Sequence, residues 1–197
     1  METLVSICVG VGLSAACGFR VFVPLFAMSM ASLAGHLTLS PGFEWIGTYP
    51  ALAAFAIATC LEIAGYYIPW VDNLLDTIAT PAAIVAGTIV TASVVSGMSP
   101  FLKWALAVIA GGGVAGTVQV ATGVTRGAST VTTAGIGNPL VATMELGGAM
   151  ALSVLAIALP VIAGIVVLGL LYYGVMKIIE KHRGYSPHIR ASEKSPG

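Results

Sequence analysis

Six ionisable side chains lie within or beside long apolar stretches of the sequence: Arg20, Glu62, Asp72, Asp76, Arg126 and Glu145. A charged group inside a membrane-spanning segment is costly, so it usually faces the interior of a helix bundle or a water-filled path. The two arginines and two glutamates could bind a small solute or ion, with the carboxylates carrying protons. The alternative is two structural Arg–Glu pairs, because buried charges need partners whatever the function.

Asp72 and Asp76 are four residues apart, so on a helix they share one face. One interpretation is a vestibule that attracts cations. The other is a solvated helix N-terminus, where the helix dipole stabilises carboxylates. The spacing alone does not separate these alternatives.

A polar run of Thr, Gly and Asn precedes Pro139, and its members Thr133, Gly135, Gly137 and Asn138 resemble the carbonyl-lined loops of cation filters. The same residue types are also typical of an ordinary turn before a helix, with Pro139 in the first helical turn. Both interpretations stay open at this point.

Nothing in the sequence predicts an enzyme, a catalytic residue, a metal site or a cofactor. The motifs of hydrolases, zinc proteases and nucleotide-binding loops are all missing. The three cysteines (Cys8, Cys17 and Cys60) lie in apolar runs, where a thiol packs as a small apolar side chain. The histidines fall in a loop and in the tail, without metal-binding spacing.

The elements that must position the charges are transmembrane helices. Hydrophobic residues make up 57% of the 197 residues and charged residues only 8%, against about a quarter in soluble domains. The apolar stretches 3–35, 50–70, 77–98, 101–124 and 139–179 leave room for about six crossings of about 20 residues each. We therefore expect an all-α polytopic bundle in the lipid bilayer. Further copies of the chain are expected as partners, and binding of nucleic acid is not expected.

The first apolar stretch, 3–35, is too long for one crossing and too short for two. Gly18-Phe19-Arg20 and then Pro24 interrupt it. We expect one full span followed by a half-length or re-entrant helix, because a broken backbone within the membrane must be covered by protein or a water-filled cavity.

The basic residues predict the orientation. Five of the eight lie in the last 21 residues, and the 36–49 loop contains none. By the positive-inside bias, the C-terminus is cytoplasmic, and the 36–49 loop is on the opposite side of the inner (plasma) membrane. Six crossings then place the N-terminus inside as well. We expect one transmembrane domain, 1–179, and a flexible basic tail, 180–197.

The two halves of the chain share an order of features. In each half a span is followed by a Gly…Arg break, a Glu-bearing span and a Pro-bearing span. Segments 3–96 and 101–179 could therefore form an inverted 3+3 repeat, as in many secondary transporters, with a site near the midplane. Chance similarity of Gly- and Ala-rich membrane sequences is the alternative.

Three motifs together resemble a known family. They are Gly18-Phe19-Arg20 with Pro24, Ile68-Pro69-Trp70-Val71-Asp72-Asn73-Leu74-Leu75-Asp76-Thr77, and Gly135-Ile136-Gly137-Asn138-Pro139 with Glu145. The chain is similar over residues 4–175 to small bacterial membrane proteins grouped as domain of unknown function 4126. The resemblance implies membrane class and architecture, but no substrate. The function expected is small-solute or ion transport; the alternative is a membrane scaffold, assembly partner or lipid-handling protein.

Overall fold

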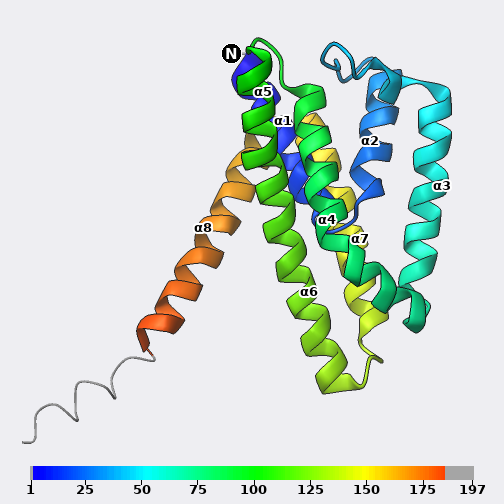
Figure 1. Cartoon of the computed structure of the whole chain (residues 1–197), viewed down its shortest axis with the longest axis vertical. Coiled ribbons are helices and arrows are strands. Elements are labelled where there is room, and N and C mark those ends of the chain that lie inside the picture. Colours follow the sequence, from blue (N-terminus) through cyan, green and yellow to red (C-terminus); the bar gives the residue numbers. More distant parts are fainter. Residues whose placement is uncertain (1, 185–197) are drawn as a thin grey trace, which may run out of the picture. The chain divides into compact units, whose positions relative to one another are not determined.

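The computed structural model describes residues 2–184, apart from the side chains of residues 69, 70, 72–74, 76, 178 and 181–184. The chain divides into two compact units, Met1–Gly164 and Ile165–Gly197. The helices in chain order are α1 (Glu2–Cys17), α2 (Phe22–Leu33), the 3-10 helix η1 (Glu44–Gly47), α3 (Tyr49–Tyr66), α4 (Pro69–Val94), α5 (Pro100–Leu106), the π-helical segment η2 (Ala107–Gly112), α6 (Gly113–Thr133), α7 (Asn138–Ala158) and α8 (Pro160–Gly184) (Figure 1).

Five helical stretches are long and apolar enough to cross a membrane. Five of the helices that carry them, α3, α4, α5, α7 and α8, have a proline in their first two positions, where the missing N–H would find no intrahelical acceptor. The predicted all-α, multi-pass membrane bundle is confirmed. The five stretches are Tyr49–Tyr66, Thr77–Val94, Pro100–Thr133, Asn138–Ala158 and Pro160–Lys177.

The first apolar stretch breaks at the predicted glycine–arginine position, but neither piece is a full span. At 1.5 Å per residue, α1 is about 24 Å long and α2 about 18 Å. Along α1, Ser14 Oγ donates a hydrogen bond of 2.8 Å to the Gly87 carbonyl of α4. On the way back, the Met28 sulfur of α2 accepts one from Ser93 Oγ near the end of α4. We call this pair of helices the α1–α2 hairpin; it is re-entrant, since it enters and leaves at one end of the bundle.

This hairpin corrects the predicted position of the N-terminus. Thr3 lies against Gly97, just beyond the end of α4, where a Cβ on the glycine would be 3.1 Å from the threonine hydroxyl. The 36–49 loop is fastened at the same end, because the Ser40 N–H donates to the Ser93 carbonyl at 2.6 Å. The N-terminus and the 36–49 loop therefore share one end of the first unit, and the expectation that they lie on opposite sides is wrong.

Single cysteines test this arrangement. In a variant without the native cysteines, Glu2→Cys and Thr38→Cys should both react with an impermeant thiol reagent added to one side of the membrane. Ile136→Cys, at the exposed α6–α7 turn, should react only from the other side. All three positions are exposed in the structure. Labelling of Glu2→Cys and Thr38→Cys from opposite sides would contradict the hairpin.

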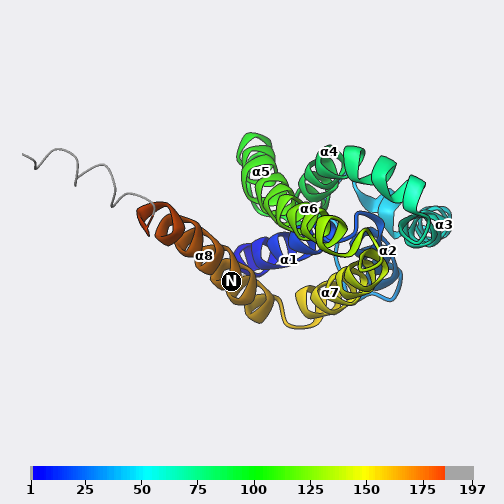
Figure 2. The ribbon, with the colours of Figure 1, turned by 90° about the horizontal axis from the view of Figure 1, so that it is seen from below.

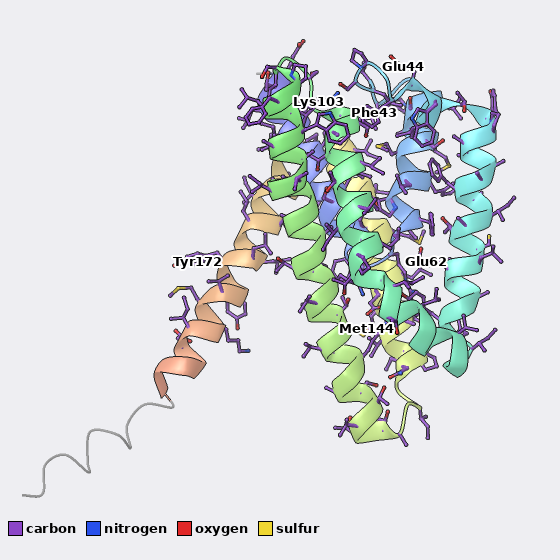
Figure 3. The ribbon with its side chains drawn as sticks, viewed as in Figure 1. Phe43, Glu44, Glu62, Lys103, Met144 and Tyr172 are labelled. Atoms are coloured by element: carbon purple, nitrogen blue, oxygen red, sulfur yellow. The ribbon has the colours of Figure 1, made fainter. Side chains whose placement is uncertain are left out.

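A lysine anchors the 36–49 loop to α5. Lys103 Nζ donates to Ser40 Oγ at 2.7 Å and lies 4.9 Å from the centre of the Phe43 ring. Figure 3 shows Lys103 and Phe43 side by side at this end of the molecule, with Glu44 close by. The Lys103 side chain thus connects the 36–49 loop to α5 through Ser40 and Phe43.

Glycines bring α4 into close contact with η2 and α6. A Cβ on Gly116 would lie 2.9 Å from the Ile84 side chain, and one on Gly112 would lie 3.2 Å from the Ile84 carbonyl. Gly112 and Gly116, four residues apart, thus form a small-xxx-small packing motif. Seen from below in Figure 2, α6 lies beside α4 and close to α1.

The second half of the chain departs from the predicted repeat order. The expected Gly…Arg break at 123–126 is wrong, because these residues lie inside the continuous helix α6. The polar segment 122–139 is helical as far as Thr133 and turns only over residues 134–137. Arg20 therefore lies at a helix break and Arg126 within a helix. The inverted repeat of 3–96 and 101–179 stays a prediction.

The predicted basic tail begins inside a helix. Helix α8 continues to Gly184, so residues 180–184 of the predicted tail are helical. The tail beyond them, residues 185–197, lies outside the described part of the chain.

Candidate functional site

The four charged residues singled out by the sequence meet at the tip of the α1–α2 hairpin. Arg20 comes from the break itself, Glu62 from α3, Arg126 from α6 and Glu145 from α7. Their exposed fractions are 2%, 8%, 3% and 4%, so all four side chains are buried. Residues more than 120 positions apart in sequence are thus brought into one charged cluster, which we call the hairpin-tip cluster.

Glu145 is shared by both arginines. Arg126 Nε donates to its two oxygens at 2.9 and 3.1 Å, and Arg126 Nη2 also contacts Oε2, so the pair is fork-like. Arg20 Nη2 approaches the same Oε2 at 3.6 Å. Two separate structural Arg–Glu pairs were one of the two alternatives from the sequence, and the structure instead shows one carboxylate between two guanidinium groups.

Glu62 has a different role, because it binds backbone rather than arginine. Its Oε1 accepts the Val21 N–H at 2.8 Å and its Oε2 accepts the Phe22 N–H at 3.1 Å. These two N–H groups belong to the start of α2, where the chain has no capping side chain of its own. Glu62 therefore caps α2 from a neighbouring helix, as its position between α3 and α2 in Figure 3 shows.

Arg20 is only partly satisfied. Its Nη2 donates to the Ala142 carbonyl of α7 at 2.8 Å. Its Nε and Nη1 are buried and have no hydrogen-bond partner in the described chain. These two nitrogens carry three of the five N–H donors of a guanidinium group. A buried donor without an acceptor is costly, so this is the feature of the cluster that internal bracing does not explain.

Tyr66 is a member of the cluster that the sequence did not predict. The central guanidinium carbons of Arg20 and Arg126 lie 3.8 and 3.9 Å from the centre of its ring. The Tyr66 side chain is buried, unlike that of the neighbouring Tyr67, which is exposed. Its spacing was the available signal: four residues after Glu62, it must lie on the same face of α3.

The cluster lies near one end of the spanning helices. Glu62 is four residues before the last residue of α3, which places it about 6 Å from that end at 1.5 Å per residue. This is the end opposite the 36–49 loop, because that loop leads into the start of α3. The tip of the α1–α2 hairpin therefore lies in the half of the first unit that is away from the 36–49 loop, and α6 and α7 continue beyond it (Figure 1).

One family model matches this chain, and it covers residues 7–179. That family is the domain of unknown function DUF4126. The chain belongs to it. No curated protein and no solved structure matches the chain.

The DUF4126 match spans every residue of the hairpin-tip cluster, as well as the two other groups predicted from sequence. Asp72 and Asp76 stand on α4, but their side chains lie outside the described part of the structure. The filter-like residues Thr133, Gly135, Gly137 and Asn138 form the α6–α7 turn and its flanks, away from the cluster. Where side chains are described, no three His, Cys, Asp or Glu residues of this DUF4126 chain group as metal ligands would.

Proposed function

We propose that this membrane protein binds and transports a small monovalent anion, with Arg20 as the binding group at the tip of the α1–α2 hairpin. The observation that carries the proposal is the pair of buried Arg20 nitrogens without an acceptor. An anion at Nε and Nη1 would supply charge-assisted hydrogen bonds there. The orientation predicted from the basic residues, with the 36–49 loop on the outer side of the membrane, would place the cluster in the cytoplasmic half.

Buried polar groups on the helices that carry Arg126 and Glu62 support a path for a polar solute. The buried face of α6 carries Gln119 and Thr122 in the two turns before Arg126. On α3, the buried Thr59 hydroxyl has no hydrogen-bond partner in the described chain and lies one turn before Glu62. Polar residues on the buried face of a membrane helix are typical of a substrate or ion pathway.

A second candidate function has its own support. All four charged side chains are buried, Glu62 caps α2, and Glu145 holds Arg126. These contacts would also suit a non-transporting scaffold, assembly partner or lipid-handling protein in which the charges only brace the hairpin. Under that alternative no anion binds at Arg20.

The test is binding and flux of radiolabelled chloride, nitrate and lactate, with the purified protein in liposomes. We expect Arg20→Lys to keep the positive charge but to lower the affinity at least about tenfold, because an ammonium cannot offer the planar set of donors. The control is Lys103→Gln, which removes a cation from the opposite end of the bundle and should leave binding unchanged. If wild-type protein neither binds nor moves these anions above protein-free liposomes, the bracing alternative is the better account.

A further inference from the structure

We infer that Glu62 occupies the place of the transported anion and that its protonation admits the anion, so that one proton and one anion move together. This inference rests on the proposed function and deepens it. The start of a helix, with its free N–H groups and positive dipole end, is a ready anion site. Here the two N–H groups, on Val21 and Phe22, are each held by one oxygen of the Glu62 carboxylate.

The start of α2 also has a buried arginine next to it in the chain, which could contribute further hydrogen-bond donors to an anion. Arg20 directly precedes Val21 and is 98% buried, since its exposed fraction is 2%. Its Nε and Nη1 lack acceptors in the described residues, while Glu62 leaves them unused. An anion that replaced the Glu62 carboxylate would accept from the N–H groups of α2 and from Arg20 together.

The charges of the cluster explain why a proton must accompany the anion. Arg20, Arg126, Glu62 and Glu145 bring two basic and two acidic side chains into one buried site. An anion added alone would make this site more negative by one charge, and a proton added alone would make it more positive by one; each change is costly in a buried site. Added together, they leave the charge of the site unchanged, so each raises the affinity for the other.

Glu62 is the carboxylate that can exchange. Glu145 is held by the fork of Arg126, whereas Glu62 bonds only neutral backbone N–H groups in the described chain. The titratable and charged groups near it are Cys17 of α1, Arg20 at the break and Arg126 of α6. Tyr66 of α3 and Glu145 of α7 in turn lie against the two arginines. The two aspartates of α4, Asp72 and Asp76, have side chains outside the described structure.

The exchange balances as a simple substitution. A proton adds to one Glu62 oxygen, the carboxyl group leaves the N–H groups of Val21 and Phe22, and the anion accepts from them. Release reverses each step. No electron is transferred and no covalent bond other than the O–H bond forms or breaks.

The experiment is anion binding and flux over a pH series, with the chloride, nitrate and lactate used above. In wild-type protein the affinity should rise about tenfold for each unit that the pH falls, as expected for one coupled proton. Glu62→Gln mimics the protonated carboxyl, so it should bind the anion independently of pH, keep anion–anion exchange and lose uphill uptake driven by a proton gradient. Glu44→Gln, in the exposed 36–49 loop, is the matched control and should behave as wild type.

A measurement on the wild-type protein keeps the test independent of whether Glu62→Gln folds. A pH dye trapped in liposomes should report one proton entering with each nitrate, and clamping the membrane potential should not change the rate. Anion binding without pH dependence, or a Glu62→Gln variant with the pH dependence of wild type, would overturn the coupling but leave anion transport standing. Absence of anion binding at every pH would instead overturn the proposed function itself.

Discussion

Replacing Glu145 by alanine is expected to lower the free energy of unfolding by about 3–5 kcal/mol, the cost of breaking a buried ion pair. The carboxylate lies between two guanidinium groups, with Arg126 hydrogen-bonded to it and Arg20 at 3.6 Å. Both guanidinium groups also lie over the same Tyr66 ring. Removing the shared carboxylate would therefore leave two like charges close together in a buried site.

The measurement is thermal unfolding of the purified variants in detergent, arranged as a double-mutant cycle. Arg126→Gln alone should cost less than Glu145→Ala, because Arg20 still accompanies the glutamate. Glu145→Gln should be destabilising by itself, and adding Arg126→Gln should recover part of the loss, since the pair is then neutral. Additive effects of the two Gln substitutions would show that the fork contributes no coupling energy.

From the sequence alone, the members of the hairpin-tip cluster could be found more easily than the contacts between them. Arg20, Glu62, Arg126 and Glu145 could be found because a charge in an apolar span stands out against its surroundings. The pairing could not be found in the same way. Which carboxylate faces which arginine depends on how far each helix is rotated about its axis and shifted along it. Glu62 accepts hydrogen bonds from backbone N–H groups, and no sequence pattern shows that these groups lack a local partner.

The helix break was predictable, but the direction of the chain after it was not. Gly18-Phe19-Arg20 marked the interruption, and it lies where expected. A continued crossing and a return to the same end have the same composition, so only tertiary contacts such as Ser14 with Gly87 and Met28 with Ser93 decide between them. The second Gly…Arg motif failed as a predictor, because Gly123 and Gly127 lie in open surroundings where a helix tolerates glycine.

The second large effect is expected at Gly87, where α4 touches the π-helical segment. An alanine Cβ at Gly87 would lie 2.7 Å from the Gly111 carbonyl oxygen and 2.6 Å from the Ala115 side chain. The first neighbour is backbone in the middle of a helix, so relief requires α4 and η2 to separate. The Gly87 carbonyl also accepts the Ser14 hydroxyl, which ties the α1–α2 hairpin to the same contact.

We therefore expect Gly87→Ala to lower the free energy of unfolding by about 1–3 kcal/mol, the usual cost of overpacking a close contact. Gly123→Ala is the matched control, a glycine inside α6 with nothing within 4 Å of its added Cβ. It should leave stability unchanged or raise it by up to about 1 kcal/mol, because alanine is the better helix former. Thermal unfolding of both variants in one detergent makes the comparison. Equal effects of the two substitutions would mean that helix propensity, rather than the α4–η2 contact, determines the result. A selective loss at Gly87 would show that the close contact between α4 and η2 contributes to the stability of the fold.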